Sequence, residues 1–240
     1  MFENRTYRSQ SNKKGLVPFT ITVKETDLHI QAESDLSDKA VKSVLLCRSY
    51  LESYIKRYPI FLTSMTPVSL ISPAPKIAAD MIEASKKANV GPMAAVAGAV
   101  AEFTCQALLK HSKEVIVENG GDIFMKLEKE TVFGIFAGNS PLSMKTGVRL
   151  AKRENPFALC TSSGTLGHSK SFGQADAATI VSDSCPLADA VATALGNMVK
   201  KESDIEKAIN AGKEINGIKG IIIIKGEKIG LWGDLELVRL

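Results

Sequence analysis

The 240-residue sequence predicts an α+β fold, in which helices flank a mainly antiparallel sheet. Short β-like segments with turn residues between them dominate the chain after Glu114. Helical patterns occur both before and after this β-rich region. Such grouping of strands and helices is typical of α+β proteins rather than of alternating α/β folds. The chain has neither a Gly/Ser linker nor an internal repeat, so we expect a single domain over residues 1–240.

The first 60 residues predict a β-hairpin followed by a long helix. Residues 16–24 and 27–32 are rich in β-branched residues and alternate in polarity, with a short polar break between them. Residues 35–58 carry apolar side chains at helical spacing. Asp35 and Ser37 are the expected cap residues of this helix, and Pro59 ends it.

The next segments predict an extended connection and two further helices. Residues 60–75 contain three prolines among apolar residues, which favours an extended crossing segment. A helix is expected over residues 76–89, and a second after Pro92, which suits a first helical turn. This second helix is rich in Ala and Gly, and Gly91 before it permits close approach of a chain or ligand. It therefore faces either a tightly packed helix or sheet, or a ligand.

The remainder predicts the strands that complete the sheet. Apolar segments separated by turns run from Glu114 to about Ser182. Helices follow at residues 186–200 and 203–211, and a strand–turn–strand with Gly226 at its turn closes the sheet. We expect a pocket-forming core over residues 90–200 and C-terminal strands over residues 216–240, the last of them LELVRL.

Composition and charge argue against several classes of protein. The chain has 30 basic and 26 acidic residues, a balance that does not favour nucleic-acid binding. The locally basic segment with Arg5, Arg8, Lys13 and Lys14 is either a solvated tail or an arm that contacts phosphate. The N-terminus does not resemble a signal peptide, and no apolar run reaches the ~18 residues of a membrane span. We expect a cytoplasmic protein with no membrane partner.

The segment VENGGDIF combines a turn signal with a candidate ligand site. Asn119-Gly120 between two apolar runs predicts a β-hairpin. Gly121 and Asp122 exceed what a hairpin needs, and consecutive glycines expose backbone N–H groups that can bind anions. The segment is therefore a plain turn, or a turn that lines a ligand pocket.

The segment DSCPLADAVATAL contains a candidate metal site. Asp183 or Ser184 can cap the helix, and Pro186 fits its first turn. Asp189 and Thr193 are four residues apart, so both project from one helical face. A carboxylate and a hydroxyl are oxygen ligands that suit Mg²⁺, with waters and phosphate oxygens completing its shell. Alternatively, Asp189 only stabilises the N-terminal part of the helix through the helix dipole, and Thr193 faces solvent.

A Ser/Gly-rich loop forms the third constellation. The stretch from Cys160 to Ala178 contains Ser163, Gly164 and His168, and its hydroxyls and imidazole could contact phosphate or transfer a proton. A surface loop without a chemical role is the alternative.

Taken in order, these motifs resemble the ApbE-like superfamily, whose best-known members are FAD:protein FMN transferases. The likeness spans about Gly91 to Met198, with NGGDI and ADAVATAL as its most specific parts, and is greatest to the superfamily's short cytoplasmic branch. It implies an ApbE-like, T-fold-related architecture. It also implies that Asp189 and Thr193 bind Mg²⁺, and that Gly120, Gly121, Asp122, Ser163 and Gly164 line a pocket for FAD or FMN.

The activity implied by the resemblance is transfer of FMN from FAD to a hydroxyl of an acceptor protein, with His168 as a catalytic residue. The chain departs from the transferases at two places. Ala97-Gly98 replaces their Lys-Gly pair, and no Asp-Pro follows His168. These departures leave open a non-catalytic module that binds a small phosphorylated ligand. The resemblance to the short branch also implies a second alternative, an enzyme or accessory of anaerobic sulfur assimilation (homocysteine formation), in which Cys160 and Cys185 could act. A homodimer is compatible with each.

Overall fold

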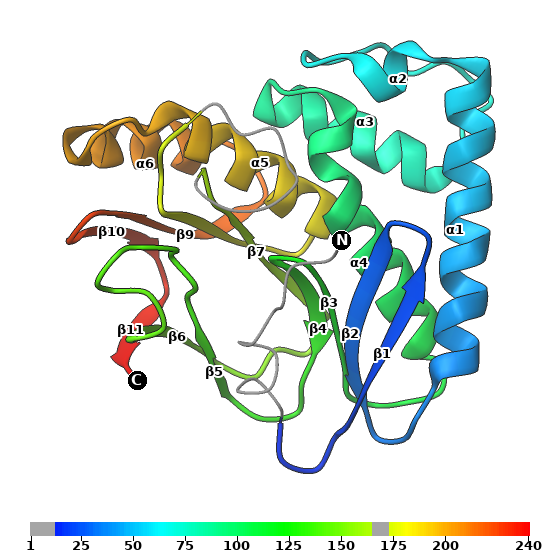
Figure 1. The fold of residues 1–240 in the computed structure, drawn as a ribbon, viewed down its shortest axis with the longest axis horizontal. Coiled ribbons are helices and arrows are strands. Elements are labelled where there is room, and N and C mark those ends of the chain that lie inside the picture. The colour runs from blue at the N-terminus through cyan, green and yellow to red at the C-terminus, as the bar shows by residue number, and fades with distance from the viewer. Residues whose placement is uncertain (1–12, 165–172) are drawn as a thin grey trace.

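A computed structural model describes residues 13–164 and 173–240 of the chain (Figure 1). Residues 1–12 and 165–172 lie outside the described residues. The expectations for Arg5, Arg8 and His168 therefore concern positions about which the structure gives no information.

The framework is an 8-stranded antiparallel sheet with strand order β1-β2-β3-β4-β7-β8-β9-β10. A second, 3-stranded sheet has the order β11-β6-β5. The strands of the large sheet are Val17–Val23 (β1), Thr26–Ala32 (β2), Val115–Asn119 (β3), Asp122–Lys126 (β4), Phe157–Ser162 (β7), Ala177–Ser182 (β8), Ile218–Lys225 (β9) and Lys228–Gly233 (β10). Those of the small sheet are Thr131–Gly134 (β5), Thr146–Leu150 (β6) and Glu236–Arg239 (β11).

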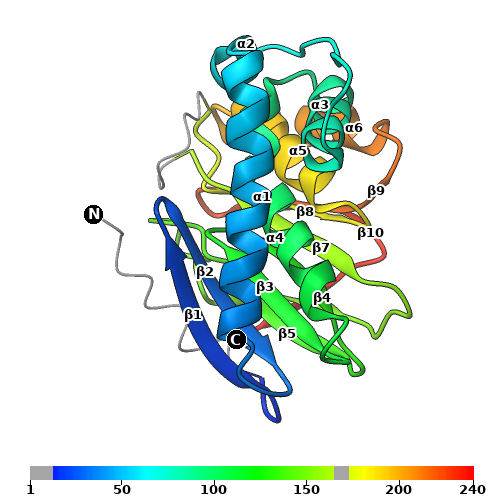
Figure 2. The same cartoon turned by 90° about the vertical axis from the view of Figure 1, so that its right-hand side faces the viewer.

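Helices cover one face of the large sheet (Figures 1 and 2). They are Ser37–Arg57 (α1), Ile60–Thr63 (α2), Lys76–Ala88 (α3), Val96–Leu108 (α4), Cys185–Met198 (α5) and Ile205–Lys213 (α6). Short 3₁₀ turns at Pro92–Ala95 (η2) and Glu202–Asp204 (η3) lead into α4 and α6. Among the described residues, no helix is both long and apolar enough to cross a membrane.

Two apolar layers hold the fold together, one on each face of the large sheet. The larger lies between the sheet and the helices and includes Leu28, Val117 and Ile221. The smaller includes Met125, Phe157 and Ile222 from the large sheet, together with side chains of the small sheet. Because side chains alternate along a strand, the same strands supply both layers.

The α+β fold with its antiparallel sheet and flanking helices is confirmed, including the N-terminal hairpin, the long helix and the C-terminal strands. Two local expectations were wrong. Residues 60–75 are not extended throughout, because α2 forms at Ile60–Thr63 before the first proline of the segment. The N-cap position of α1 is Leu36, and the Asp35 carboxylate accepts hydrogen bonds from the N–H and hydroxyl of Ser37 instead of capping the helix.

The Ala/Gly-rich helix α4 packs tightly against α5. A Cβ at Gly98 would lie 2.5 Å from the Cys185 carbonyl oxygen and 2.9 Å from the Asp189 Cβ, so only glycine fits there. A Cβ at Gly91 would overlap the Ser64 backbone. Of the two interpretations of this segment, close packing between elements is therefore the one that the fold uses.

Candidate functional site

The NGGD segment is a hairpin whose second glycine is required by a neighbouring strand. Asn119 pairs with Asp122, and Gly120 has a φ of 75°, which glycine adopts without strain. Gly121 lies against β7, where a Cβ would overlap the Thr161 carbonyl oxygen. The Thr161 N–H donates to the Gly121 carbonyl at 2.9 Å. This contact places Asp122 opposite Cys160, inside the sheet.

Asp189 lies at the contact between α5 and the beginning of α4. The helix α5 starts where predicted, with the Ser184 hydroxyl capping it by accepting from the Leu187 N–H. One turn further, Asp189 is buried, with 8% of its surface exposed. Its Oδ2 accepts from the Gly98 N–H at 2.9 Å, and the Ala97 N–H also donates to the carboxylate. Asp189 therefore links the two helices.

The surroundings of Asp189 disfavour its negative charge. Burial raises the pKa of the Asp189 carboxyl well above its usual value, and the charge of Asp122 raises this pKa further. The hydrogen bonds from Gly98 and Ala97 act in the opposite direction but do not cancel these effects. Two buried carboxyl groups from distant parts of the sequence therefore lie within electrostatic reach of each other, and Asp189 favours its protonated form.

The residues at this place fit a hard divalent cation. Thr193 follows Asp189 by one turn of α5 and is half-buried, as its spacing predicts. A carboxylate has about four acceptor positions, so the bonds to α4 leave Asp189 capacity for a metal. Within residues 13–164 and 173–240, no three His, Cys, Asp or Glu side chains are grouped to hold a metal. A bound cation would therefore take ligands from Thr193, water or phosphate as well, which Mg²⁺ commonly does.

One end of the Ser/Gly loop, at Gly173, contacts the C-terminal half of α5, and the other end, at Gly164, lies against Gly173. The Gly164 N–H donates to the Ala175 carbonyl at 2.9 Å, and the Gly173 N–H donates to Asn197 Oδ1 at 3.2 Å. A Cβ at Gly173 would overlap the Gly196 carbonyl oxygen. Gly173 therefore lies against the helix that carries Asp189 and Thr193, with Gly164 beside it, whereas His168 is outside the described residues.

Three residues that tie the site together were not predicted. Asn119 donates its side-chain N–H to the Ala97 carbonyl at 3.1 Å, which fixes the hairpin to the first turn of α4. Gly98 supplies the N–H to Asp189. Glu102 accepts from the Cys185 N–H at 2.8 Å, at the start of α5. The only signal for these contacts in the sequence was the Ala97-Gly98 pair, which indicated that another element packs closely there but not which one.

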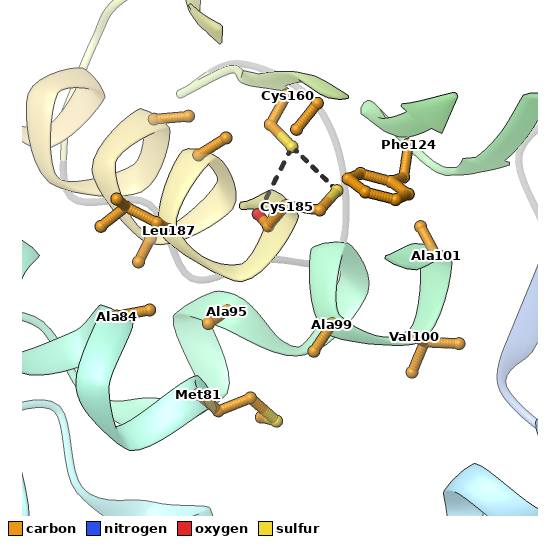
Figure 3. Close-up of a cluster of buried hydrophobic side chains, with 14 of the residues drawn as sticks. Met81, Ala84, Ala95, Ala99, Val100, Ala101, Phe124, Cys160, Cys185 and Leu187 are labelled. Atoms are coloured by element: carbon orange, nitrogen blue, oxygen red, sulfur yellow. Dashed lines mark hydrogen bonds between the residues drawn. The ribbon is translucent and has the colours of Figure 1, made fainter. Parts of the chain in front are cut away.

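Cys160 and Cys185 lie side by side in the core (Figure 3). The Sγ atoms of Cys160 and Cys185 are 3.5 Å apart, and both residues are buried. Burial raises the pKa of the Cys160 thiol well above its usual value and that of Cys185 to about 11. Both sulfurs therefore hold their protons at neutral pH.

Comparison with solved structures identifies the fold as that of the ApbE-like proteins. The flavin transferase ApbE of Vibrio cholerae has a TM-score of 0.56 and 12% identity, over 90% of this chain and 96% of the transferase. The ApbE protein of Thermotoga maritima has a TM-score of 0.57 and 13% identity, over the same shares of the two chains. The fold that the resemblance implied is thus confirmed.

The chain belongs to the family described as AbpE bacteria, which matches residues 8–231. Its curated relatives include a UPF0280 protein of Methanocaldococcus jannaschii, 42% identical over 226 residues and covering 91% of this chain and 92% of the relative. A UPF0280 protein of Methanococcus maripaludis is 41% identical over 221 residues, covering 90% of each chain.

Proposed function

We propose that the protein binds a flavin nucleotide, or a similar phosphorylated ligand, together with Mg²⁺ between the NGGD hairpin and α5. The observation that carries the proposal is the burial of Asp189 within the electrostatic influence of Asp122. Burying like charges is costly unless a cation or proton compensates them. A divalent cation here would relieve the cost and attract a phosphorylated ligand.

Each predicted residue has a role in this proposal. Asp189 and Thr193 would hold Mg²⁺, which supplies neutralisation of pyrophosphate charge when it is bound. Gly120 and Gly121 bring backbone close to the ligand, and Asp122 borders the same space. Ser163 and Gly164, at the base of the loop, complete the pocket. Two structural relatives are flavin transferases, which makes FAD and FMN the first ligands to test.

Transfer of FMN from FAD to a hydroxyl of an acceptor protein is the finer form of the proposal, with His168 as its catalytic residue. Ala97 stands where the transferases carry Lys, so one positive charge of their pocket is missing here. Binding without transfer would indicate the non-catalytic module. The sulfur-assimilation alternative stays a prediction, and the protonated thiols of Cys160 and Cys185 do not favour a thiolate mechanism.

Calorimetric titration tests the binding proposal. FAD, FMN, ATP and ADP are titrated into the wild type in Mg²⁺ and in EDTA, and then into Asp189→Asn. We expect Mg²⁺-dependent FAD binding that weakens at least about tenfold in Asp189→Asn, since this variant keeps an acceptor for Gly98 but loses the charge.

Asp183→Asn is the matched control, because Asp183 precedes the same helix but is exposed and pairs with Lys219. It should bind like the wild type. Equal affinity in wild type and Asp189→Asn would overturn the metal assignment. If binding is found, incubation with FAD and Ser/Thr-containing acceptor proteins, followed by mass spectrometry, separates transfer from binding alone.

A further inference from the structure

The large sheet ends in two edge strands that differ in their protection. In the described residues, β10 pairs only with β9 and β1 pairs only with β2, and they lie at opposite ends of the sheet (Figure 1). An edge strand exposes a row of backbone N–H and C=O groups, and proteins usually block it with proline, charge or a bulge. The residues at each edge decide whether it is blocked.

The β1 edge is blocked by a proline. A two-residue turn joins β1 to β2, and Val23 and Thr26 flank it as a pair. Since the pair flanking such a turn is hydrogen-bonded, Val23, Ile21 and Phe19 bond to β2, and the alternate residues direct their backbone groups outward. Pro18 is one of these outward-facing residues, and it has no N–H to donate to another strand.

The β10 edge has no such block. Lys225 and Lys228 flank the two-residue turn between β9 and β10, so the backbone groups of Ile229 and Leu231 point outward. These positions carry neither proline nor charge. The side chains of Ile229 and Leu231 lie on one face of the strand and are 37% and 41% exposed.

The β10 edge is also complementary to itself. A two-fold axis beside Gly230 would place Ile229 opposite Leu231 of a second copy, and both of these pairs would exchange backbone hydrogen bonds. The same register places Lys228 opposite Trp232 of the second copy, on the face that carries α6, where a cation–π contact can form. Antiparallel pairing in this register therefore joins apolar to apolar side chains and a cation to an aromatic ring.

We propose that two copies of this chain associate through antiparallel pairing of their β10 strands, which extends the large sheet across a two-fold axis. One short strand buries less surface than the roughly 1,200–2,000 Å² of a typical stable interface. The dimer should therefore be reversible and depend on protein concentration. The candidate ligand site lies away from this contact, between α4, α5 and the NGGD hairpin.

Sedimentation velocity of the full chain under reducing conditions, over a wide concentration range, tests this proposal. We expect a monomer–dimer equilibrium in the wild type. Leu231→Lys should weaken it at least about tenfold, because it buries a charge in the new apolar pair. Leu231→Pro should act similarly, since the N–H that it removes points outward and not toward β9.

Val17→Lys is the matched control, because Val17 is 42% exposed on β1, at the opposite edge. It should dimerise like the wild type. A wild type that stays monomeric at every concentration would overturn the proposal, as would Leu231→Lys dimerising normally or Val17→Lys dissociating. Thermal unfolding of each variant separates loss of pairing from loss of fold.

Discussion

At the scale of single residues, Asp189 combines a structural contact with the proposed metal ligation. Its carboxylate accepts hydrogen bonds from the Gly98 and Ala97 N–H groups at the beginning of α4. Alanine at this position would leave these buried donors without an acceptor, which costs about 1–3 kcal/mol for each group. Asparagine removes the charge and keeps one acceptor oxygen for these donors, so it disturbs the contact with α4 less than alanine does.

Asp189→Asn should raise the free energy of unfolding at pH 7 in the absence of divalent cations. The pKa of Asp189 is raised in the folded protein, so the folded state binds the proton more tightly than the unfolded state. The wild type therefore loses stability as pH rises from the usual carboxyl pKa of 3.8 toward the raised value. Urea unfolding of both proteins at several pH values measures this dependence. If the free energy of unfolding depended on pH no more steeply in the wild type than in the variant, the prediction would be contradicted.

At the scale of elements, glycines decide how closely the strands and helices approach. Gly121 lets the NGGD hairpin lie against β7, and Gly98 lets α4 lie against α5. These two contacts bring Asp122 and Asp189 into one region. The positions of these glycines are visible in the sequence, but which element packs against each of them depends on the order of the strands and the packing of the helices.

Gly121→Ala should destabilise the protein by about 1–3 kcal/mol, because its Cβ would overlap the Thr161 carbonyl oxygen. Gly196→Ala is the control, since its Cβ would find its nearest neighbour at 3.7 Å, inside a helix where alanine is favoured. Denaturant unfolding of the two variants compares them. Equal stability of Gly121→Ala and the wild type would show that the hairpin can move away from β7.

At the scale of the whole molecule, one sheet separates two apolar layers. Strands of the large sheet contribute to both layers, with Val117 on the helix side and Ile116 on the side of the small sheet. Because the same strands form one side of each layer, unfolding of one layer would also disrupt the packing of the other. This arrangement supports the proposal that residues 1–240 form one domain.

Calorimetric unfolding of the chain without ligand should therefore show a single cooperative transition. The measured and van't Hoff enthalpies should agree, as they do for one cooperative unit. Dilute protein is needed, so that association between copies does not enter the measurement. Two resolved transitions would contradict a single domain and would indicate that the small sheet unfolds separately.

The sequence by itself determined the local structure: the alternating strands, the amphipathic α1, the Asn119-Gly120 turn and the Pro186 helix start. These depend on periodicity and turn chemistry within a few residues, which a sequence displays directly. It also displayed the motifs that resemble the ApbE-like proteins. Only the tertiary structure decided that Asp189 accepts from Gly98, that Asn119 holds Ala97 and that Gly121 meets Thr161. Each of these contacts joins residues far apart in the chain, and long-range contacts depend on how all the elements pack together.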